Sequence, residues 1–389
     1  MIYYTIINVN IKDGKIMRVI SFFSGAGGMD LGFELAGHRI VWANDFDKDA
    51  VETYNYNIGR YSNHSVLLGD ICNILNDYSE STEGIYGNIP DADILIGGFP
   101  CQGFSVANLK RNMDDERNYL YLEILRVIQA KNPKFVILEN VKGLENIEKG
   151  EVLNMIIQDI QNTGIGYTVV YNVFNAYNFG VPQNRERVII LGVRNDILEN
   201  YTIPVIKSNK NLKNKYKKLY IPITHSIESS IQDPFTSYEK INFLYENWRI
   251  NNLDFNQHYY FNNEIYSVQT VRNTISDLPF EFCPDSNEYY NHTGTLCKVK
   301  IKNTVGNRET LWDKYSPTIM GRGSGTGGPL IIPHPEQHRR LSIREVARIQ
   351  TFPDKFIFKG SNSACYRQIG NAVPVLMAYN IAKLIPLNL

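Results

Sequence analysis

The sequence predicts an α/β protein with a doubly wound, mainly parallel sheet and a second, smaller, irregular domain. The chain opens with a strand over residues 16–23, a glycine-rich turn and a helix over 28–36. Strands and helices then alternate up to about residue 195. This alternation is typical of βαβ units, whose crossover connections make consecutive strands parallel. After residue 195 the sequence lacks long helical periodicity, which indicates a separate domain with variable loops.

The next two strands are indicated by short apolar runs that end in polar residues or glycine. Residues 39–43 form one such run, which is followed by Asp45. Residues 91–97 form another, closed by glycines. Cys101 comes shortly after this run, so we expect it just beyond the carboxyl end of a buried strand. In a doubly wound fold that position is the usual location of an active site.

The later elements follow the same pattern. They are a helix over 118–131, a strand over 134–139, a helix over 152–161, and strands over 167–174 and 187–193. A further helix is predicted over 342–351, where Ser342 and Glu345 have the spacing of a capping box. The chain therefore divides into four segments: an extension over 1–16, which is expected to be dispensable, a first domain over 17–195, a second domain over 196–337, and a return to the first domain over 338–389.

Composition narrows the class of protein. Hydrophobic residues make up 43% and charged residues 21% of the chain, and no apolar run approaches the roughly 18 residues that a membrane span needs. The first 16 residues lack the apolar core of a secretory leader, so a cytoplasmic location is expected. The five cysteines are odd in number and never form a Cys-x-x-Cys pair, which favours free thiols. No metal site is expected.

The formal net charge of zero argues against a basic surface over the whole molecule, but it permits a local one. Lysines gather between residues 207 and 218 without an acidic residue among them. This stretch is either a solvated face or a contact to phosphates.

The glycine-rich turn predicts a cofactor site. Gly25 and Gly27 begin the dinucleotide pattern G-x-G-x-x-G, but its third glycine is replaced by Asp30, which disfavours a nicotinamide dehydrogenase. Backbone amides at a helix start still suit a polar cofactor without a pyrophosphate. Asp45 is placed to accept hydrogen bonds from ribose hydroxyls, and Phe46 offers a ring face to an adenine. A turn that merely requires glycine is the alternative.

Five motifs resemble, in order and spacing, those of the cytosine-5 DNA methyltransferases of bacterial restriction–modification systems. The motifs are Phe23-Ser24-Gly25-Ala26-Gly27-Gly28, Gly97-Gly98-Phe99-Pro100-Cys101-Gln102-Gly103-Phe104-Ser105, Glu139-Asn140-Val141, Gln183-Asn184-Arg185-Glu186-Arg187 and Gly370-Asn371-Ala372-Val373-Pro374. The resemblance covers about 17–195 and 338–385. Between these regions such enzymes carry a target-recognition domain, and residues 316–319 resemble its closing segment.

The resemblance implies a Rossmann-like fold and methyl transfer to carbon 5 of a flipped-out cytosine in a specific double-stranded DNA sequence. Carbon 5 is a weak nucleophile, so the thiolate of Cys101 must first add to carbon 6 of the ring. Glu139 is implied to bind ring N3 and the exocyclic amine, and Arg187 to bind O2. Arg185 is implied to lie in the same site near the thiol or the backbone, with a structural salt bridge as the alternative.

The same resemblance implies S-adenosylmethionine as the cofactor and S-adenosylhomocysteine as its product. The residues implied to bind it are Phe23, Gly25, Gly27, Asp45, Phe46, Asp70, Ile71, Leu120, Asn371 and Val373. Asp45 departs from the glutamate of many relatives, and its shorter side chain reaches less far toward the ribose. Residues 105–117 are expected to form a loop that closes over DNA.

The expected partner is double-stranded DNA, bound by a monomer that works alongside a restriction endonuclease without a stable complex. A tRNA cytosine methyltransferase is an alternative, but its Cys-Phe-Thr string is missing from this chain. A catalytically inactive DNA-binding relative is disfavoured because Cys101, Glu139 and Arg187 are all present. A thiol hydrolase is disfavoured because no histidine stands in a recognisable triad context. The recognised DNA sequence cannot be read from residue types.

Overall fold

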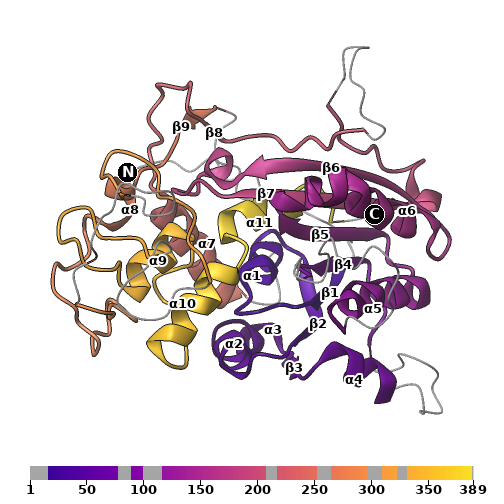
Figure 1. Cartoon of the computed structure of the whole chain (residues 1–389), viewed down its shortest axis with the longest axis horizontal. Helices are drawn as coiled ribbons and strands as arrows, with labels where there is room; N and C mark the ends of the chain where they lie inside the picture. The colour runs from indigo at the N-terminus through magenta and orange to yellow at the C-terminus, as the bar shows by residue number, and fades with distance from the viewer. Residues whose placement is uncertain are drawn as a thin grey trace.

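A computed structural model of the chain describes residues 16–77, 89–99, 116–206, 217–251, 264–296, 299, 309–321, 331–387 and 389. Its centre is a seven-stranded sheet with the order β3-β2-β1-β4-β5-β7-β6 (Figure 1). The strands are β1 (Arg18–Phe22), β2 (Arg39–Asp45), β3 (Val66–Leu68), β4 (Ile94–Gly97), β5 (Phe135–Val141), β6 (Tyr167–Asn175) and β7 (Glu186–Arg194). The first five strands pair in parallel, and the strand order reverses between β1 and β4. The predicted doubly wound, mainly parallel sheet is confirmed.

One strand runs against the others. β7 pairs antiparallel with β5 on one side and with β6 on the other. Alternation of strands and helices predicts a strand here, but it does not fix the direction of the strand. Because β7 is reversed, its first residues lie at the edge of the sheet where the parallel strands end. That edge is where ligands bind in open α/β sheets.

Helices lie on both faces of the sheet, and others pack to one side of it (Figure 1). They are α1 (Gly28–Leu35), α2 (Lys48–Tyr54), α3 (Arg60–Ser62), α4 (Ile71–Asp77), α5 (Glu116–Lys131), α6 (Glu151–Asn162), α7 (Ser237–Asn251), α8 (Val271–Ile275), α9 (Ile343–Ile349), α10 (Asn362–Asn371) and α11 (Val375–Ala382), with a π-helical turn at Asn55–Gly59. Among the helices to one side of the sheet are α8, α9 and α10. A two-stranded ribbon pairs β8 (His225–Ser226) with β9 (Tyr266–Ser267). Within the described residues no helix is both long and apolar enough to cross a membrane.

Two hydrophobic cores result, because successive side chains of a strand point to opposite faces. Val19 and Ile94 belong to the core shared with α1, α2, α7 and the last three helices. Their neighbours Ile20 and Leu95 belong to the core shared with α4, α5 and α6. The central strands β1 and β4 are buried on both faces, which explains their nearly continuous apolar sequences.

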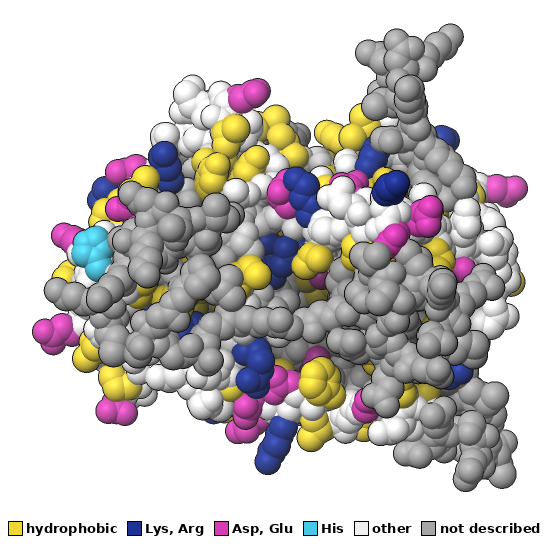
Figure 2. All heavy atoms as spheres, viewed as in Figure 1, with side chains coloured by type: hydrophobic (Ala, Val, Ile, Leu, Met, Phe, Trp, Pro, Cys, Tyr) yellow, Lys and Arg dark blue, Asp and Glu magenta, His cyan; other side chains and the backbone are white. Residues whose placement is uncertain are grey.

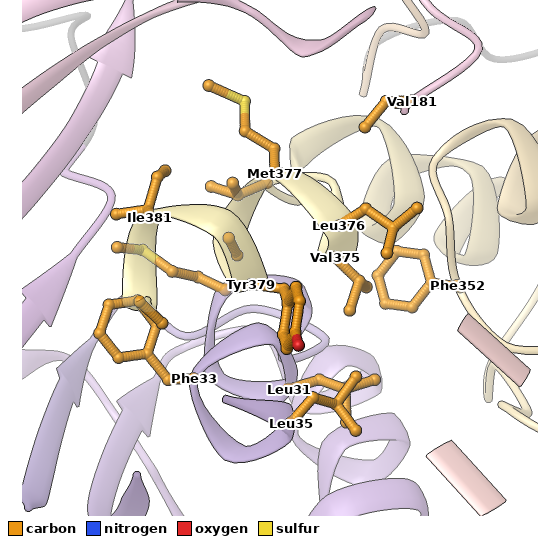
Figure 3. Packing of buried hydrophobic residues seen from close by; sticks show 14 of the residues in the cluster. Leu31, Phe33, Leu35, Val181, Phe352, Val375, Leu376, Met377, Tyr379 and Ile381 are labelled. Carbon is orange, nitrogen blue, oxygen red and sulfur yellow. The ribbon is translucent and has the colours of Figure 1, made fainter. Parts of the chain in front are cut away.

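The end of the chain packs against its beginning. Figure 3 shows Leu31 and Leu35 of α1 facing Val375 and Tyr379 of α11. The two helices cross closely, since a Cβ added at Gly32 would stand 2.5 Å from the Cβ of Ala378. The predicted capping box of α9 is also confirmed: Glu345 N donates to Ser342 Oγ at 3.0 Å, and Ser342 N donates to Glu345 Oε2 at 2.6 Å.

The expectation that the second domain, over residues 196–337, is irregular is wrong for α7, which spans 15 residues. Ile241, Leu244, Tyr245 and Trp248 are all buried at helical spacing. Trp248 Nε1 donates to Glu34 Oε2 of α1 at 3.2 Å. The frequent polar residues between these positions hide the helical period in the sequence. The helix therefore joins the same core as the first domain, while the division into domains stays a prediction. Of the extension over 1–16, residues 1–15 lie outside the described residues, and so do the lysines between 207 and 216.

Candidate active site

The candidate site lies where β5 ends and β7 begins. Val141 pairs with Arg187, and Glu139 pairs with Ile189, so the antiparallel register brings Glu139 and Arg187 to the same edge. Arg187 Nε lies 2.6 Å from Glu139 Oε1, and each side chain is only 12% exposed. Arg187 Nη1 also donates to the carbonyl of Glu186 at 2.8 Å. The structure thus brings together two of the predicted site residues as one partly buried ion pair.

The end of β4 lies beside this ion pair. A Cβ added at Gly98 would stand 3.2 Å from Glu139 Oε2, so glycine gives the carboxylate room. Asn140, only 3% exposed, donates from Nδ2 to the carbonyl of Phe99 at 3.0 Å. This hydrogen bond fixes the chain just before Pro100 to β5. Asn140 belongs to a motif that the sequence revealed, but its role became visible only through this contact.

Cys101 itself lies outside the described residues, as does most of the predicted loop over 105–117. Its assignment as the nucleophile stays a prediction. Two of the described cysteines are poorly suited to that role, because burial raises the pKa of the Cys72 and Cys365 thiols to about 11. Thiolate is the nucleophilic form, and a raised pKa reduces its population at neutral pH.

Arg185 has different partners from Arg187. Its side chain is only 1% exposed, and its guanidinium donates to three backbone carbonyls, of Ile319 at 2.8 Å, Gly370 at 2.9 Å and Ala372 at 3.0 Å. Among the described residues it forms no ion pair with a carboxylate, so the alternative of a structural salt bridge is not what the geometry displays. Burial lowers the pKa of this guanidinium. Arg185 thus connects the start of β7 to two distant segments.

Two buried glutamines complete this connection, and sequence reasoning gave neither of them a role. Gln183 Nε2 donates to Gln350 Oε1 at 2.5 Å, and Gln183 Oε1 accepts from Ile319 N at 3.0 Å. Gln350 Nε2 in turn donates to the carbonyls of Ile369 and Ala372. Because Gln183 lies more than 130 residues from both Gln350 and Ile319 in sequence, no local pattern could have found its contacts.

The predicted cofactor loop between β1 and α1 is tightly held. Phe23 has a φ of 55°, in the left-handed region, and so does Gly25. Gly25 N donates to Asp45 Oδ2 at 2.8 Å, while no atom lies within 4 Å of the place of a Cβ on Gly25. At Gly27 a Cβ would stand 2.4 Å from Ile58 Cδ1. The loop is therefore packed against the Ile58 side chain at Gly27, whereas the space beside Gly25 is open. This open space leaves room for a ligand.

Residues at the end of β2 and after β3 line the same edge. Asp45 is buried and accepts from the backbone of Gly25 and of Asp47, and burial raises its pKa. Phe46 is 75% exposed, so its ring is free to stack on a planar group. Asp70 is exposed and accepts from Cys72 N at 2.9 Å at the start of α4. Ile71 is buried beside it.

The remaining predicted cofactor residues come from α5 and from the junction of α10 and α11. Leu120 is partly buried against the second core. The side chain of Asn371 lies against Gly321, whose added Cβ would stand 1.9 Å from Asn371 Oδ1. The carbonyl of Val373 would stand 2.4 Å from a Cβ on Gly28. The carboxyl-terminal motif therefore packs directly on the cofactor loop.

Figure 2 shows basic and acidic side chains interspersed over the described part of one face. On that part of the face no extended basic surface is visible, in keeping with the net charge of zero.

Solved structures with the same fold are methyltransferases. A prophage-encoded DNA modification methyltransferase of Escherichia coli has a TM-score of 0.58 and 23% identity, over 95% of this chain and 98% of the other. The Dnmt2 methyltransferase of S. pombe has a TM-score of 0.56 and 19% identity, with the same shares covered. The fold is therefore the Rossmann-like fold of C5 methyltransferases.

Sequence comparison is more specific. A profile of the C-5 cytosine-specific DNA methylases matches residues 17–386. Type II methyltransferase M.NgoFVII of Neisseria gonorrhoeae is 34% identical over 98% of this chain and 90% of its own length. M.BsuRI of Bacillus subtilis is 34% identical over 96% and 80%. The chain belongs to the C-5 cytosine-specific DNA methylase family, and it is a DNA cytosine-5 methyltransferase of the restriction–modification type.

Proposed function

We propose that this enzyme methylates carbon 5 of a flipped-out cytosine in one short double-stranded DNA sequence, through a covalent bond between Cys101 and carbon 6 of the base. We further propose that the methylation protects DNA from a partner endonuclease. The observation that carries the proposal is the ion pair of Glu139 and Arg187 at the sheet edge, 2.6 Å apart. A carboxylate and a guanidinium held side by side match the donor and acceptor edge of cytosine.

The thiolate of Cys101 attacks carbon 6 and forms the Sγ–C6 bond, while N3 takes a proton from Glu139. The ring becomes an enamine that is nucleophilic at carbon 5. S-adenosylmethionine, when bound, supplies the methyl group that carbon 5 takes up. The cofactor would leave as S-adenosylhomocysteine. A base then removes the carbon 5 proton, the Sγ–C6 bond breaks with its electron pair going back to sulfur, and N3 returns its proton to Glu139, so that the thiolate, the acid and the aromatic ring are restored. Arg187 holds O2 of the base throughout.

The cofactor fits the loop between β1 and α1. Open space above Gly25 and the amides at the start of α1 accommodate its polar methionine end. Asp45 is close enough to bind Gly25 N and retains lone pairs for ribose hydroxyls. The exposed ring of Phe46 suits stacking on adenine. Asp70 is the acceptor that we assign to the adenine amine.

Glu139 and Arg187 are each 12% exposed, so they cannot reach the ring edge of a cytosine that is paired in a duplex. The target base therefore leaves the stack, at a cost of a few kcal/mol. Arg185 does not touch the base in this proposal. Its three carbonyl partners make it a positioning residue that holds β7 in register with the carboxyl-terminal motif.

The test is base-resolution methylation sequencing of DNA from a host that lacks cytosine methylation. Cells express the wild-type chain, the variant Cys101→Ala, or Cys72→Ala as the matched control. We expect 5-methylcytosine in one sequence context with the wild type and with Cys72→Ala, and none with Cys101→Ala. Methylation by Cys101→Ala would refute the covalent route. Modified RNA together with unmodified DNA would favour the tRNA methyltransferase.

Two further measurements address the finer parts of the proposal. DNA that carries 5-fluorocytosine at the target should form an adduct with the wild type that resists denaturation, and no adduct with Cys101→Ala. Methylated plasmid should resist endonucleases that cut at the sequence found. Full cleavage of methylated plasmid by every such endonuclease would count against the protective role.

A further inference from the structure

A buried carboxylate closes the base of the cofactor loop. Ser21 is in β1 and precedes the loop, and Asp30 is in the first turn of α1 and follows it. Ser21 Oγ donates to Asp30 Oδ1 at 2.8 Å. Both residues are buried, at 1% and 0% exposure. One hydrogen bond thus joins the two ends of the loop that contains Phe23, Gly25 and Gly27.

Asp30 is also the residue that interrupts the dinucleotide pattern in the sequence. In that pattern the third glycine allows close packing of helix against strand. Here a side chain occupies this position and makes a specific contact to the strand instead. The hydrogen bond between Ser21 and Asp30 therefore takes the place of the close packing that a glycine would allow.

Tyr54 of α2 holds the same carboxylate from a second direction. Its hydroxyl donates to Asp30 Oδ2 at 2.8 Å and lies 3.1 Å from His64 Nε2 on its other side. Its ring supports the loop directly, because a Cβ on Gly27 would stand 2.8 Å from Tyr54 Cδ2. Tyr54 therefore touches both the middle of the loop and the group that closes its base.

Burying the carboxylate of Asp30 costs free energy, because the group loses its hydration. Asp30 is fully buried, and within the described part of the chain it forms no ion pair with a cation. Burial raises its pKa to about 7, against hydrogen bonds from Ser21 and Tyr54 that lower it. An apolar residue at a buried position of this kind often gives equal or greater stability. A role beyond stability explains its presence more directly.

We propose that Asp30, held by Ser21 and Tyr54, is a positioning residue that sets the shape of loop 23–27 for the cofactor. The proposal rests on the proposed function, because it assumes that this loop binds S-adenosylmethionine. The three side chains need not touch the cofactor. They fix the backbone amides and the left-handed turns that do.

The test uses the full chain with Tyr54→Phe, which keeps the ring under Gly27 and removes only the hydroxyl, together with Ser21→Ala and Asp30→Asn. Glu34→Gln is the matched control. Glu34 is a second buried carboxylate of α1 whose pKa burial also raises to about 7, and it binds Ile40 N and Trp248 Nε1 away from the loop. Calorimetry gives the Kd for S-adenosylhomocysteine without DNA, and steady-state assays give KM for the cofactor and kcat. Thermal unfolding gives Tm.

We expect the Kd and the cofactor KM to rise about 10-fold in Tyr54→Phe and Asp30→Asn, with kcat at saturating cofactor within about twofold, as the loss of a buried hydrogen bond predicts. Glu34→Gln should change Kd and KM less than about twofold even where its Tm falls as far. Unchanged affinity in the loop variants, or an equal loss in Glu34→Gln at equal Tm, would overturn the proposal. If the wild type binds no S-adenosylhomocysteine, the proposed function fails as well, which separates the two failures.

Discussion

Arg187 Nε lies 2.6 Å from Glu139 Oε1, and this ion pair lies at the edge of the sheet where the parallel strands end. The pair joins two strands of opposite direction, since β5 ends and β7 begins at the same edge. Each residue holds the other before DNA arrives, which keeps both side chains in a narrow range of conformations. Preorganised charges of this kind need little rearrangement during the reaction.

Replacing Glu139 by glutamine tests its role as the acid. Glutamine keeps the size of the side chain but cannot deliver a proton to N3. We expect the single-turnover rate to fall by about 10²- to 10⁴-fold, the usual range for a lost general acid, while DNA affinity changes little. Rapid-quench assays with methyl-labelled cofactor measure the rate.

Glu186→Gln is the control for that experiment. Glu186 neighbours Arg187 in the chain, but its carboxylate pairs with the exposed Lys142 at 2.8 Å. Its rate should stay within about threefold of the wild type, since exposed ion pairs contribute little. A rate for Glu139→Gln as high as that of Glu186→Gln would contradict the acid role.

Arg185→Met should act on stability. The substitution leaves the carbonyls of Ile319 and Gly370 without their buried donor, while the carbonyl of Ala372 keeps Gln350 Nε2. We expect a loss of about 2–5 kcal/mol in the free energy of unfolding, because each unsatisfied buried group costs about 1–3 kcal/mol. Urea unfolding measures the loss. Arg272→Gln, which removes an exposed pair with Asp313, should cost less than about 1 kcal/mol. Equal losses in the two variants would show that the carbonyl network does not stabilise the fold.

Much of the sheet could be predicted from sequence, because its strands are short apolar runs bounded by glycine or polar residues. The expected strand over 187–193 is observed as β7, Glu186–Arg194. The antiparallel direction of β7 could not be predicted from local sequence patterns, because it depends on the strands with which β7 pairs. The π-helical turn at Asn55–Gly59 and the two-residue strands β8 and β9 give no distinct periodicity at all.

In the site, too, residues in local motifs could be predicted from sequence, whereas contacts between distant segments could not. Glu139 and Arg187 could be found because each stands in a recognisable motif, and the structure brings them together. The partners of Arg185 could not, since all three carbonyls lie more than 130 residues away in sequence. Every residue has a backbone carbonyl, so the residue type of a partner does not indicate such a contact.

Two glycines of the cofactor loop should respond differently to alanine. Gly25 and Gly27 both have positive φ, at 55° and 89°, so each substitution carries backbone strain of about 1–2 kcal/mol. Only at Gly27 does the added Cβ also meet side chains, 2.4 Å from Ile58 Cδ1. Gly27→Ala should therefore lose about 2–4 kcal/mol of stability in total. Gly25→Ala should lose only the backbone part, about 1–2 kcal/mol. It should bind S-adenosylhomocysteine at least about 10-fold more weakly, because its methyl group enters the open space for the ligand.

Urea unfolding and calorimetry on the two glycine variants separate these effects. Full cofactor affinity in Gly25→Ala would mean that the open space above this residue is not part of the binding site. A stability of Gly27→Ala equal to that of Gly25→Ala would mean that Ile58 and Tyr54 move aside at no cost.

The contact between α1 and α7 should make stability depend on pH through Glu34. Burial raises the pKa of this carboxyl from 4.5 to about 7 in the folded chain. Between these values the folded state keeps a proton that the unfolded state releases, so the contribution of Glu34 to stability falls as pH rises through this window. Above pH 8 the carboxylate is ionised in both states, and the dependence ends.

Other groups titrate in the same range. Burial lowers the pKa of His64 to about 4, for example, and this shift acts in the opposite direction. The contribution of Glu34 is therefore measured as the difference in the free energy of unfolding between the wild type and Glu34→Gln. The free energy of unfolding of the wild type minus that of Glu34→Gln should fall by ~3 kcal/mol between pH 5 and pH 8, at 1.36 kcal/mol per unit of pKa shift. Urea unfolding at half-unit pH steps measures this difference. A difference that stays constant or rises with pH would show that Glu34 is already ionised at pH 5, and that its hydrogen bonds to Ile40 and Trp248 outweigh its burial.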